Sequence, residues 1–394
     1  MKQGWEYKKL GEVGTFIRGK NIQKTDFVEK GLPCIHYGQL HTVFGVSTDK
    51  HLSNIPQELY EQSIIASKND VLLALTSEDV EGSCRSTAWL GNYDVAVSSD
   101  AAVYKHSMNP KFVTYYLRSN SFFIEKSKYA RGFKVTHIKT SDIAKIPIPL
   151  PPKSTQLAIV SELDKINELI RLKKEQLKDY DNLAQSIFYE MFGDPVENEM
   201  GWEVKKLEKV CNITSSKRIF ADEYTDKGIP FYRSKEVIER SKGIPISVEL
   251  FISPERYSEI KEKFGIPVVG DILITAVGTI GKIWSIDTDE KFYFKDGNLV
   301  WLKDIDTSLI NTIFFKRLLE YLIDEYKKIN ANGAAYSALT IAKIKLMQCP
   351  LPPLPLQQLF AQRIEQIERQ KAEVQKTITD LETLLASRMQ YWFE

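Results

Sequence analysis

The sequence predicts an α/β (α+β) fold with a pseudo-twofold internal repeat. Two similar globular domains are joined by two long helices, which pair as an antiparallel coiled coil within one chain. Three observations predict this fold. Residues 4–10 (GWEYKKL) return as residues 201–207 (GWEVKKL), at an offset of 197. Residues 149–152 (PLPP) return as residues 350–353, at an offset of 201. Each PLPP segment is followed by a long, charged, apolar-striped stretch that ends in aromatic residues.

The composition is that of a folded protein with material for two domains. The chain has 394 residues, of which 43% are hydrophobic and 27% are charged, and this suits two cores of ordinary size. No stretch approaches the ~18 uninterrupted apolar residues of a membrane helix. The first residues lack the apolar segment of a secretory signal. We therefore expect a cytoplasmic protein with no membrane segment.

Cysteine and histidine spacing argues against disulfides and metal sites. The four cysteines form no close pair and no zinc spacing, which predicts buried thiols in a reducing compartment. All five histidines lie in the first half of the chain, without ligand spacing. We therefore expect no metal site.

The net charge of +1 looks unfavourable for a nucleic-acid binder, but the charge is unevenly distributed. Residues 1–152 carry 19 Lys and Arg against 15 Asp and Glu, whereas residues 153–194 carry 6 against 8. A local basic groove on the globular parts is therefore compatible with the sequence.

The Pro-rich segments divide the chain into four parts. Residues 146–152 and 349–355 favour extended, stiff backbone. We interpret them as rigid joints between a domain and a helix, in preference to ligands for peptide-binding domains. Gly193 and Pro195 end the first helix. The expected parts are domain 1 at residues 1–152, helix 1 at residues 153–194, domain 2 at residues 195–353 and helix 2 at residues 354–394.

Both long helices carry apolar residues at alternating steps of three and four. A repeat of 3.5 residues kept over about four heptads is typical of a coiled-coil seam. Lys173 and Lys371 interrupt the apolar row. The helices pair either with each other, antiparallel, or with a second chain, and their near-identical seams favour the first arrangement. The predicted packing residues are Leu163, Ile166, Ile170, Leu177, Tyr180, Ile187, Ile364, Ile367, Val374, Ile378, Leu381 and Leu385.

Each globular part has the pattern of a mixed α/β domain. Short apolar runs at residues 70–74 and 271–275 predict strands, and residues 112–117 and 313–319 predict short amphipathic helices. Outside the shared positions the two copies diverge strongly. A common frame with divergent loops is typical of two binding surfaces that perform the same task on different targets.

Together these features resemble the specificity (S) subunit of type I restriction–modification systems. The resemblance rests on the Trp-Glu-x-x-Lys-Leu start, the Gly-Leu/Ile-Pro strand, the Pro-rich joint with Gln156 or Gln357 just beyond it, the long helix, and the repetition of the whole. It covers essentially the full chain. Its specificity lies in the order and spacing of these elements rather than in one motif.

The resemblance implies a function in DNA recognition. The two domains would be target recognition domains, each reading one half of a bipartite, interrupted sequence in double-stranded DNA. The coiled coil would fix the gap between the half-sites and dock modification (methyltransferase) subunits, of which we expect two. Restriction/translocase subunits would join them. We expect no cofactor on this chain, and S-adenosylmethionine, ATP and Mg on the partner subunits.

The sequence lacks the motifs of an enzyme that acts on DNA. Neither a Gly-rich cofactor loop after the first strand nor an Asn-Pro-Pro-aromatic motif occurs. Residues 278–282 (GTIGK) lack the spacing of a phosphate loop. Glu78, Asp79 and Glu81 have no partner at nuclease spacing. We therefore expect no catalytic residue. The alternative function is a two-domain protein-interaction scaffold with an oligomerising coiled coil.

Candidate DNA-binding residues come from the divergent loops. Arg, Lys, Asn and Gln side chains can read base edges, and Lys, Arg, Ser and Tyr contact phosphates. Glycine lets a loop backbone approach a groove closely. For each residue, an ordinary exposed role is the competing interpretation. The predicted DNA-binding residues are Arg18, Lys20, Asn21, His36, Tyr37, Gln39, Arg131, Lys134, Ser216, Lys217, Arg218, Tyr232, Arg233, Lys235, Lys282, Asn332 and Tyr336.

Overall fold

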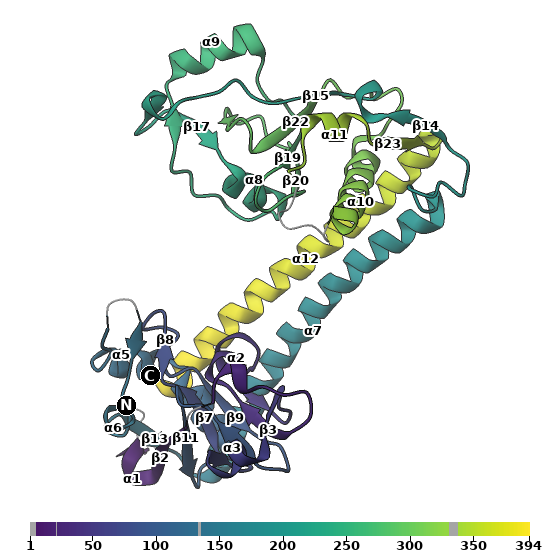
Figure 1. The fold of residues 1–394 in the computed structure, drawn as a ribbon. Coiled ribbons are helices and arrows are strands. Elements are labelled where there is room, and N and C mark those ends of the chain that lie inside the picture. Colours follow the sequence, from purple (N-terminus) through teal and green to yellow (C-terminus); the bar gives the residue numbers. More distant parts are fainter. Residues whose placement is uncertain (1–4, 21, 133–134, 331–337) are drawn as a thin grey trace. The chain divides into compact units, whose positions relative to one another are not determined.

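The structure is a computed structural model that describes residues 5–20, 22–132, 135–330 and 338–394 (Figure 1). Its contacts divide the chain into two compact units. Unit 1 is Met1–Glu175 with Val374–Glu394, and unit 2 is Gln176–Glu373. Each unit therefore holds one globular domain and part of each long helix.

The two repeated sequence motifs are partner strands in both units. In unit 1, β1 (Glu6–Lys9) pairs antiparallel with β13 (Pro147–Leu150). In unit 2, β14 (Glu203–Lys206) pairs antiparallel with β23 (Gln348–Leu351). The Pro-rich joints are extended, as expected, but they are strands rather than free polyproline segments. A two-stranded ribbon tolerates proline because each strand has an open edge, where the missing N–H is not needed.

Two larger sheets form the centre of the domain of unit 1. The five-stranded sheet has the order β2-β11-β7-β9-β4, and the four-stranded sheet has the order β5-β3-β10-β6. The strand expected at residues 70–74 is confirmed as β7, whose four residues are fully buried. A short continuous apolar run suits a strand that is covered on both faces. The strands are β2 (Gly14–Arg18), β3 (Leu32–Ile35), β4 (Ser47–Thr48), β5 (Ser53–Ile55), β6 (Ile64–Ala66), β7 (Val71–Ala74), β9 (Ser86–Trp89), β10 (Val95–Val97) and β11 (Ala101–His106), with β8 (Thr76–Ser77) paired to β12 (Thr136–His137).

The main helix of unit 1, α4 (Pro110–Leu117), packs against β7 and β9. Its start follows from local sequence, because Asn109 Oδ1 accepts a hydrogen bond from the N–H of Phe112 at 3.1 Å and proline occupies the first helical position. The helix then breaks, since Ser119 caps a new helix, α5 (Asn120–Ser127). The other helices are α1 (Leu10–Val13), η1 (Lys24–Asp26), α2 (Tyr37–Thr42), α3 (Gln57–Glu61) and α6 (Thr140–Ile143).

Unit 2 repeats the order of the central strands. Its sheets have the orders β15-β22-β19-β20 and β16-β18-β17-β21. As in unit 1, the first strand of the main sheet, β15, pairs with the last strand before the main helix, β22. On its other side β22 pairs with β19, the buried strand expected at residues 271–275. The strands are β15 (Asn212–Thr214), β16 (Tyr224–Thr225), β17 (Ile229–Tyr232), β18 (Phe251–Ile252), β19 (Ile272–Thr275), β20 (Ile283–Ser285), β21 (Tyr293–Phe294) and β22 (Leu299–Lys303).

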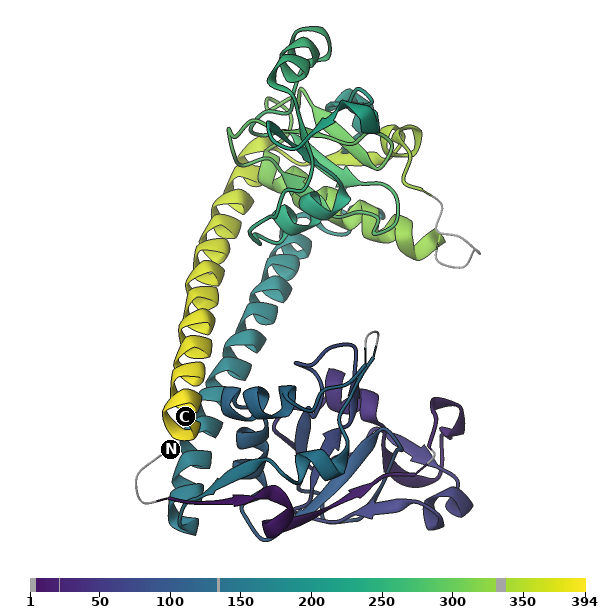
Figure 2. The same ribbon diagram turned by 90° about the vertical axis from the view of Figure 1, so that its left-hand side faces the viewer.

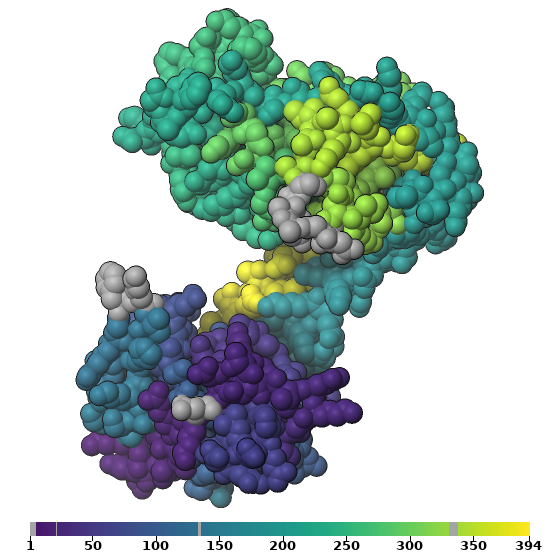
Figure 3. All heavy atoms as spheres, in the orientation of Figure 1, coloured from purple at the N-terminus to yellow at the C-terminus, as the bar shows by residue number. Residues whose placement is uncertain are grey.

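The main helix of unit 2, α10 (Thr312–Asn330), is longer than its counterpart. The sequence predicted a short helix at residues 313–319. The helix continues because no capping residue interrupts it, and Leu318, Leu319, Leu322 and Ile323 extend its buried face. Another helix, α9 (Pro254–Phe264), projects from the edge of unit 2 (Figures 1 and 3). The remaining helices are η2 (Leu207–Lys209), η3 (Ala221–Glu223), α8 (Ser234–Ser241), α9 (Pro254–Phe264) and α11 (Ile341–Lys345).

The long helices α7 (Lys153–Phe192) and α12 (Leu354–Phe393) each run unbroken for 40 residues. Within each unit they lie side by side (Figures 1 and 2). In unit 1, Glu162 pairs with Arg388, and twelve residues further along α7 Lys174 pairs with Glu382 at 2.8 Å. The partner number falls as the α7 number rises, so the pair is antiparallel.

The same direction holds in unit 2. There Asp181 pairs with Lys371 at 2.8 Å, and Arg363 donates to the sulfur of Met191 at 3.9 Å. The helices therefore pair with each other within one chain, as the sequence favoured. All twelve predicted packing residues are buried or half-buried, from Leu163 at 0% and Ile378 at 1% exposure to the half-buried Leu381 and Leu385.

The described part of the chain shows no membrane-spanning helix, no metal-binding cluster and no disulfide. None of its helices is long and apolar enough to cross a membrane. No group of three or more His, Cys, Asp and Glu side chains within it could hold a metal ion. All four cysteines, Cys34, Cys84, Cys211 and Cys349, are free and buried. Burial raises the pKa of each thiol to about 12, so these cysteines are unreactive.

Candidate nucleic-acid interface

One end of the central sheet of unit 1 gathers four chain segments, which we name loop edge 1 (residues 18–20, 76–77, 98–100 and 136–137). Two of these segments are the short paired strands β8 and β12. The strands explain this gathering. β2 and β7 both run antiparallel to β11, so the ends of β2 and β7 meet the start of β11. Backbone hydrogen bonds fasten the segments. The N–H of Gly19 donates to the carbonyl of Ala101 at 2.9 Å, and the N–H of Leu75 donates to that of Asp100 at 2.8 Å.

Unit 2 has an equivalent end, which we name loop edge 2 (residues 215–218, 276–277, 296–297 and 338–340). Segments of all four parts line one cavity of about 410 Å³. The framework hydrogen bonds are repeated. In unit 1 the N–H of Leu75 donates to the carbonyl of Asp100 at 2.8 Å. In unit 2 the N–H of Ala276 donates to the carbonyl of Asn298 at the same distance. The backbone frame is therefore duplicated while the side chains on it differ.

Arg18 and Arg218 lie on the two loop edges, although not at equivalent positions. Arg18 is the last residue of β2, whereas Arg218 lies four residues beyond the end of β15. Their side chains are 63% and 64% exposed. In unit 2, Arg218 Nε donates to Asp296 Oδ2 at 2.7 Å. In unit 1, Arg18 Nε donates to the carbonyl of Ser99 at 2.8 Å, and its Nη2 lies 3.5 Å from Asp100 Oδ1. Both guanidinium groups are held through Nε, and that of Arg18 is held through Nη2 as well.

Arg233 and Lys235 have a different environment. Arg233 Nη2 pairs with Glu236 and with Glu249, both at 2.8 Å, and its side chain is only 30% exposed. Lys235 pairs with Glu249 at 2.7 Å. The hydrogen bonds from Lys235 and Arg233 lower the pKa of Glu249 to about 2. Burial alone would raise the pKa of Glu236, but the hydrogen bonds from Arg233 lower it.

Consequently, Arg233 and Lys235 are both paired with carboxylates of their own domain. Tyr232 is 2% exposed and stacks on Phe292, with ring centroids 4.6 Å apart. Tyr232 was predicted from sequence as a DNA-binding residue, and its burial shows that this prediction was wrong. The pattern around the Gly-x-Pro strand had suggested an exposed loop, whereas the strand itself continues to Tyr232 and buries the ring.

His36 and Gln39 act as a helix cap. His36 Nδ1 accepts a hydrogen bond from the N–H of Gly38 at 3.2 Å, and Gln39 Oε1 accepts one from the N–H of His36 at 3.0 Å. Gln39 also donates to Ser53 Oγ at 2.8 Å. Burial and the nearby Lys24 lower the pKa of His36, so it is neutral near pH 7. Their polar atoms are engaged within unit 1, and Tyr37 beside them is half-buried.

The other predicted residues fall into four groups. Lys20 is exposed on loop edge 1, and Arg131 has an exposed side chain 4.0 Å from Asp142. On loop edge 2, Lys217 Nζ lies 5.2 Å from the centre of the Phe264 ring, and Ser216 Oγ is buried without a partner in the described residues. Lys282 lies in the turn after β19, where its N–H donates to Thr275 Oγ1 at 2.9 Å. Asn21, Lys134, Asn332 and Tyr336 lie outside the described residues.

Sequence reasoning missed the acceptors that hold these arginines. Asp296 and Asp100 precede the central strands β22 and β11, but nothing in their local sequence points to a loop about 80 residues away. It also missed that Gln156 and Gln357 accept hydrogen bonds from the backbone N–H groups of Asn109 and Asn311. The offset of 201 between the two glutamines was visible in the sequence. A repeated polar residue beside a joint was the signal that could have found them.

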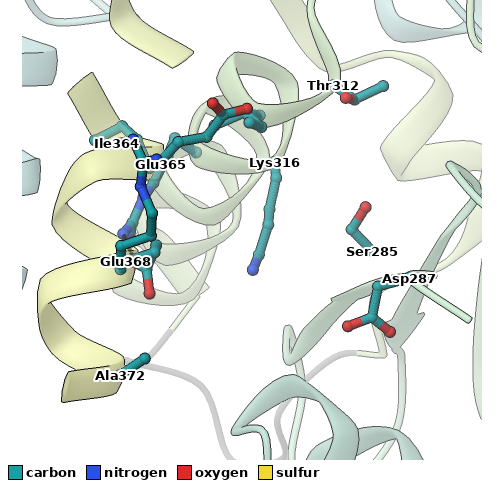
Figure 4. A pocket seen from close by; sticks show the side chains of 11 residues that line it. Ser285, Asp287, Thr312, Lys316, Ile364, Glu365, Glu368 and Ala372 are labelled. Atoms are coloured by element: carbon teal, nitrogen blue, oxygen red, sulfur yellow. Dashed lines mark ion pairs between the residues drawn. The ribbon is translucent and has the colours of Figure 1, made fainter. Parts of the chain in front are cut away.

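A separate groove of about 680 Å³ lies in unit 2 between α10, α12 and the end of β20. Figure 4 shows Lys316 extending into it between the acidic residues of α12 and Asp287. Glu368 is shared there by Arg317 at 3.5 Å and Lys371 at 3.2 Å. The groove is lined by both charge signs and lacks the basic excess that a nucleic-acid backbone needs.

A family model described as "Type I restriction modification DNA specificity domain" matches this chain twice, at residues 2–179 and 199–383. A putative type I restriction enzyme specificity subunit of Haemophilus influenzae is 28% identical over 289 residues, which cover 71% of this chain and 68% of that protein. The type I restriction enzyme MjaVIII specificity subunit of Methanocaldococcus jannaschii is 26% identical over 192 residues, covering 47% of this chain and 44% of that protein.

Solved structures share the fold over the whole chain. A structure described for complex assembly and conformational transition of the type I R-M system matches with a TM-score of 0.63 and 19% identity, covering 100% of this chain and 98% of that one. The S subunit of a type I restriction–modification system from M. genitalium matches with a TM-score of 0.53 and 15% identity, with the same coverage. At these identities the likeness concerns the fold.

Proposed function

This chain belongs to the family of type I restriction–modification DNA specificity proteins, and from that premise we propose that it recognises a bipartite, interrupted target in double-stranded DNA. Each loop edge would read one half of the target. The curated relatives are named as specificity subunits of restriction enzymes, and this chain is the specificity subunit rather than the catalytic part of such a system. The fold expected from sequence is confirmed by the double family match and by the solved structures.

The observation that carries the proposal is the duplicated frame of the loop edges. Equivalent backbone hydrogen bonds build both edges, with the same 2.8 Å bond from the buried strand to the turn before the central strand. The residues placed on that frame differ, since Arg18 and Lys20 stand where unit 2 has Ser215 to Arg218. One scaffold with two sets of polar side chains suits two different half-sites.

The paired helices support the interruption in the target. We propose that α7 and α12 act as the spacer that sets the gap between half-sites. Each helix is 40 residues long, or about 60 Å at ~1.5 Å per residue. A helix of this length is stable only when its apolar face is packed, and the seam supplies that packing. We expect half-site centres about one turn of DNA apart, ~34 Å.

We further propose that the chain brings the target to modification (methyltransferase) subunits, two of them, and to restriction/translocase subunits. S-adenosylmethionine, ATP and Mg would be bound by those partners. The duplicated structure supports two equivalent docking places. We propose a cytoplasmic location, because the DNA target and the partner subunits would be found there.

Selection from a pool of random duplex DNA tests the proposal. The full chain, purified with the subunits that accompany it, is expected to enrich a motif of two short defined segments separated by unspecified positions. Enrichment of no motif, together with binding that does not weaken as salt rises, would reject DNA recognition and favour the protein-interaction scaffold instead.

A further inference from the structure

We propose that Arg18 and Arg218 are the guanine-reading residues of this protein, one in each half-site. The proposal rests on the function above and deepens it, because it assigns a base to a side chain. Four features carry it: the anchored backbone of each loop, the exposure of each side chain, the acceptor that holds each guanidinium at Nε, and the acidic partner of each arginine.

The backbone that carries each arginine is fixed on both sides. In unit 2, the N–H of Lys217 donates to the hydroxyl of Tyr293 at 2.6 Å, and Ile219 is 5% exposed in a small apolar cluster. In unit 1, the N–H of Gly19 donates to Ala101 O at 2.9 Å, and Ile22 is 2% exposed. An anchored loop loses little entropy on binding, which a specific contact requires.

The side chains are presented with their outer edge free. Arg218 Nε donates to Asp296 Oδ2, and no acceptor among the described residues receives a hydrogen bond from either Nη group. Arg18 is arranged similarly but not identically, because its Nε donates to the carbonyl of Ser99 and its Nη2 also lies 3.5 Å from Asp100 Oδ1. Its Nη1 has no acceptor among the described residues. Nη groups on an exposed side chain, with N–H groups to spare, can form the fork that matches O6 and N7 of guanine in the major groove.

Local charge distinguishes a base contact from a phosphate contact. Asp296 neutralises Arg218, and Asp100 does the same for Arg18. A phosphate is attracted by net positive charge, which this pairing removes at the arginine itself. The edge of guanine is neutral and needs aligned donors rather than charge. The paired carboxylates therefore favour guanine.

The contrast with Arg233 sharpens the assignment. Its Nη2 group is taken by Glu236 and Glu249, and its side chain is 30% exposed, about half the exposure of Arg218. Arg233 has no free fork to offer. Of the four arginines predicted from sequence, Arg18, Arg131 and Arg218 have exposed side chains, whereas Arg233 is mostly covered and its Nη2 is occupied.

The test compares base preferences of the full chain, purified with its accompanying subunits, in selection from random duplex DNA. Arg218→Lys keeps the charge but loses the fork, so the guanine preference at one position of one half-site should fall by roughly tenfold or more. The other half-site should be unchanged. Arg18→Lys should give the mirror result.

Asp296→Asn provides an independent arm that keeps Arg218 intact. It loosens the guanidinium and adds net positive charge, so the same guanine preference should fall while the total affinity for the pool is kept or rises. Arg256→Lys on α9 is the matched control, since Arg256 is an ion-paired arginine of the same domain, 24% exposed. It should leave the base preferences as they are.

Two results would overturn the assignment. If Arg218→Lys and Arg18→Lys weaken binding to all sequences uniformly and leave every base preference intact, the arginines contact phosphate. If they change neither quantity, they do not touch DNA. Both results are distinct from failure of the proposed function, in which the unmodified protein itself enriches no motif. Circular dichroism of each variant establishes that it is folded.

Discussion

Gln357 Oε1 accepts a hydrogen bond from the backbone N–H of Asn311 at 2.8 Å, and unit 1 repeats this contact between Gln156 and Asn109 at 2.9 Å. Each glutamine also donates to the proline carbonyl five residues before it, at 2.7 Å and 3.0 Å respectively. The side chains are 0% and 5% exposed. A glutamine in the first turn of each long helix thus fastens that helix to the start of the main helix of its domain.

Gln357→Ala is expected to lower the free energy of unfolding of unit 2 by about 1–3 kcal/mol, because it leaves buried backbone groups without partners. Urea unfolding measures the loss. Gln358→Ala, at the exposed neighbouring position, is the control and should change little. Equal stability of the two variants would show that the fastening contact contributes nothing.

The half-buried Lys371 sits in the seam between Asp181 at 2.8 Å and Glu368 at 3.2 Å. Lys371→Glu replaces attraction by repulsion, so we expect a loss of about 1 kcal/mol. Asp181→Lys in the same chain should recover part of it. A double-mutant cycle followed by thermal unfolding gives the coupling. Zero coupling would mean that apolar packing alone fixes the register.

Seven residues inserted into both α7 and α12 preserve the seam, because a heptad keeps the apolar face aligned. Each helix lengthens by about 10 Å, so the gap in the selected DNA motif should grow by about three base pairs at ~3.4 Å each. An insertion in one helix alone is the control and should disrupt folding. A functional protein with an unchanged gap would reject the spacer role.

Lys20→Gln should weaken binding to every duplex by a similar factor, because Lys20 is exposed on loop edge 1 without a neutralising partner in the described residues. The slope of log affinity against log salt should become shallower by about one. Lys30→Gln, an exposed lysine elsewhere in the same domain, is the control. A base-specific effect of Lys20→Gln would instead make Lys20 a reading residue.

His106 makes unit 1 sensitive to acid. Burial lowers its pKa from 6.5 to about 4, and its Nδ1 accepts a hydrogen bond from the N–H of Met108. The folded state therefore favours the neutral ring. This contribution to stability is complete above pH 6.5 and is lost as the pH falls toward 4. His106→Gln should flatten that part of the stability–pH curve, whereas the exposed His137→Gln should not.

The main features of the fold could be predicted because they follow from repeated segments and from the periodic spacing of apolar residues. The returning GWExKKL and PLPP segments indicated two copies, and they are partner strands in both units. The seam from Leu163 to Leu385 followed from the heptad pattern. The buried strands β7 and β19 followed from short apolar runs. Each of these signals depends on residues close in sequence or on a fixed offset.

The candidate site was predicted less well. Arg218 and Arg233 look alike in sequence, each in a short polar segment after a strand. Yet Arg218 keeps its fork exposed, while Arg233 is held by Glu249 from sixteen residues away. Tyr232 was expected at the surface and is buried. Local polarity does not reveal which neighbours the folded chain brings to a side chain.

The sequence by itself determined the duplication, the apolar seam of each long helix and the places where loops diverge, because periodic burial of apolar side chains is a local property of helices and strands. The antiparallel pairing within one chain, which the sequence favoured, was decided by the contacts between the helices. Only the tertiary structure decided which charged side chains are presented outward. The exposure of a charged side chain depends on acceptors that are distant in sequence, such as Asp296, 78 residues from Arg218. It also depends on loop conformations, which a periodic pattern of apolar residues does not predict.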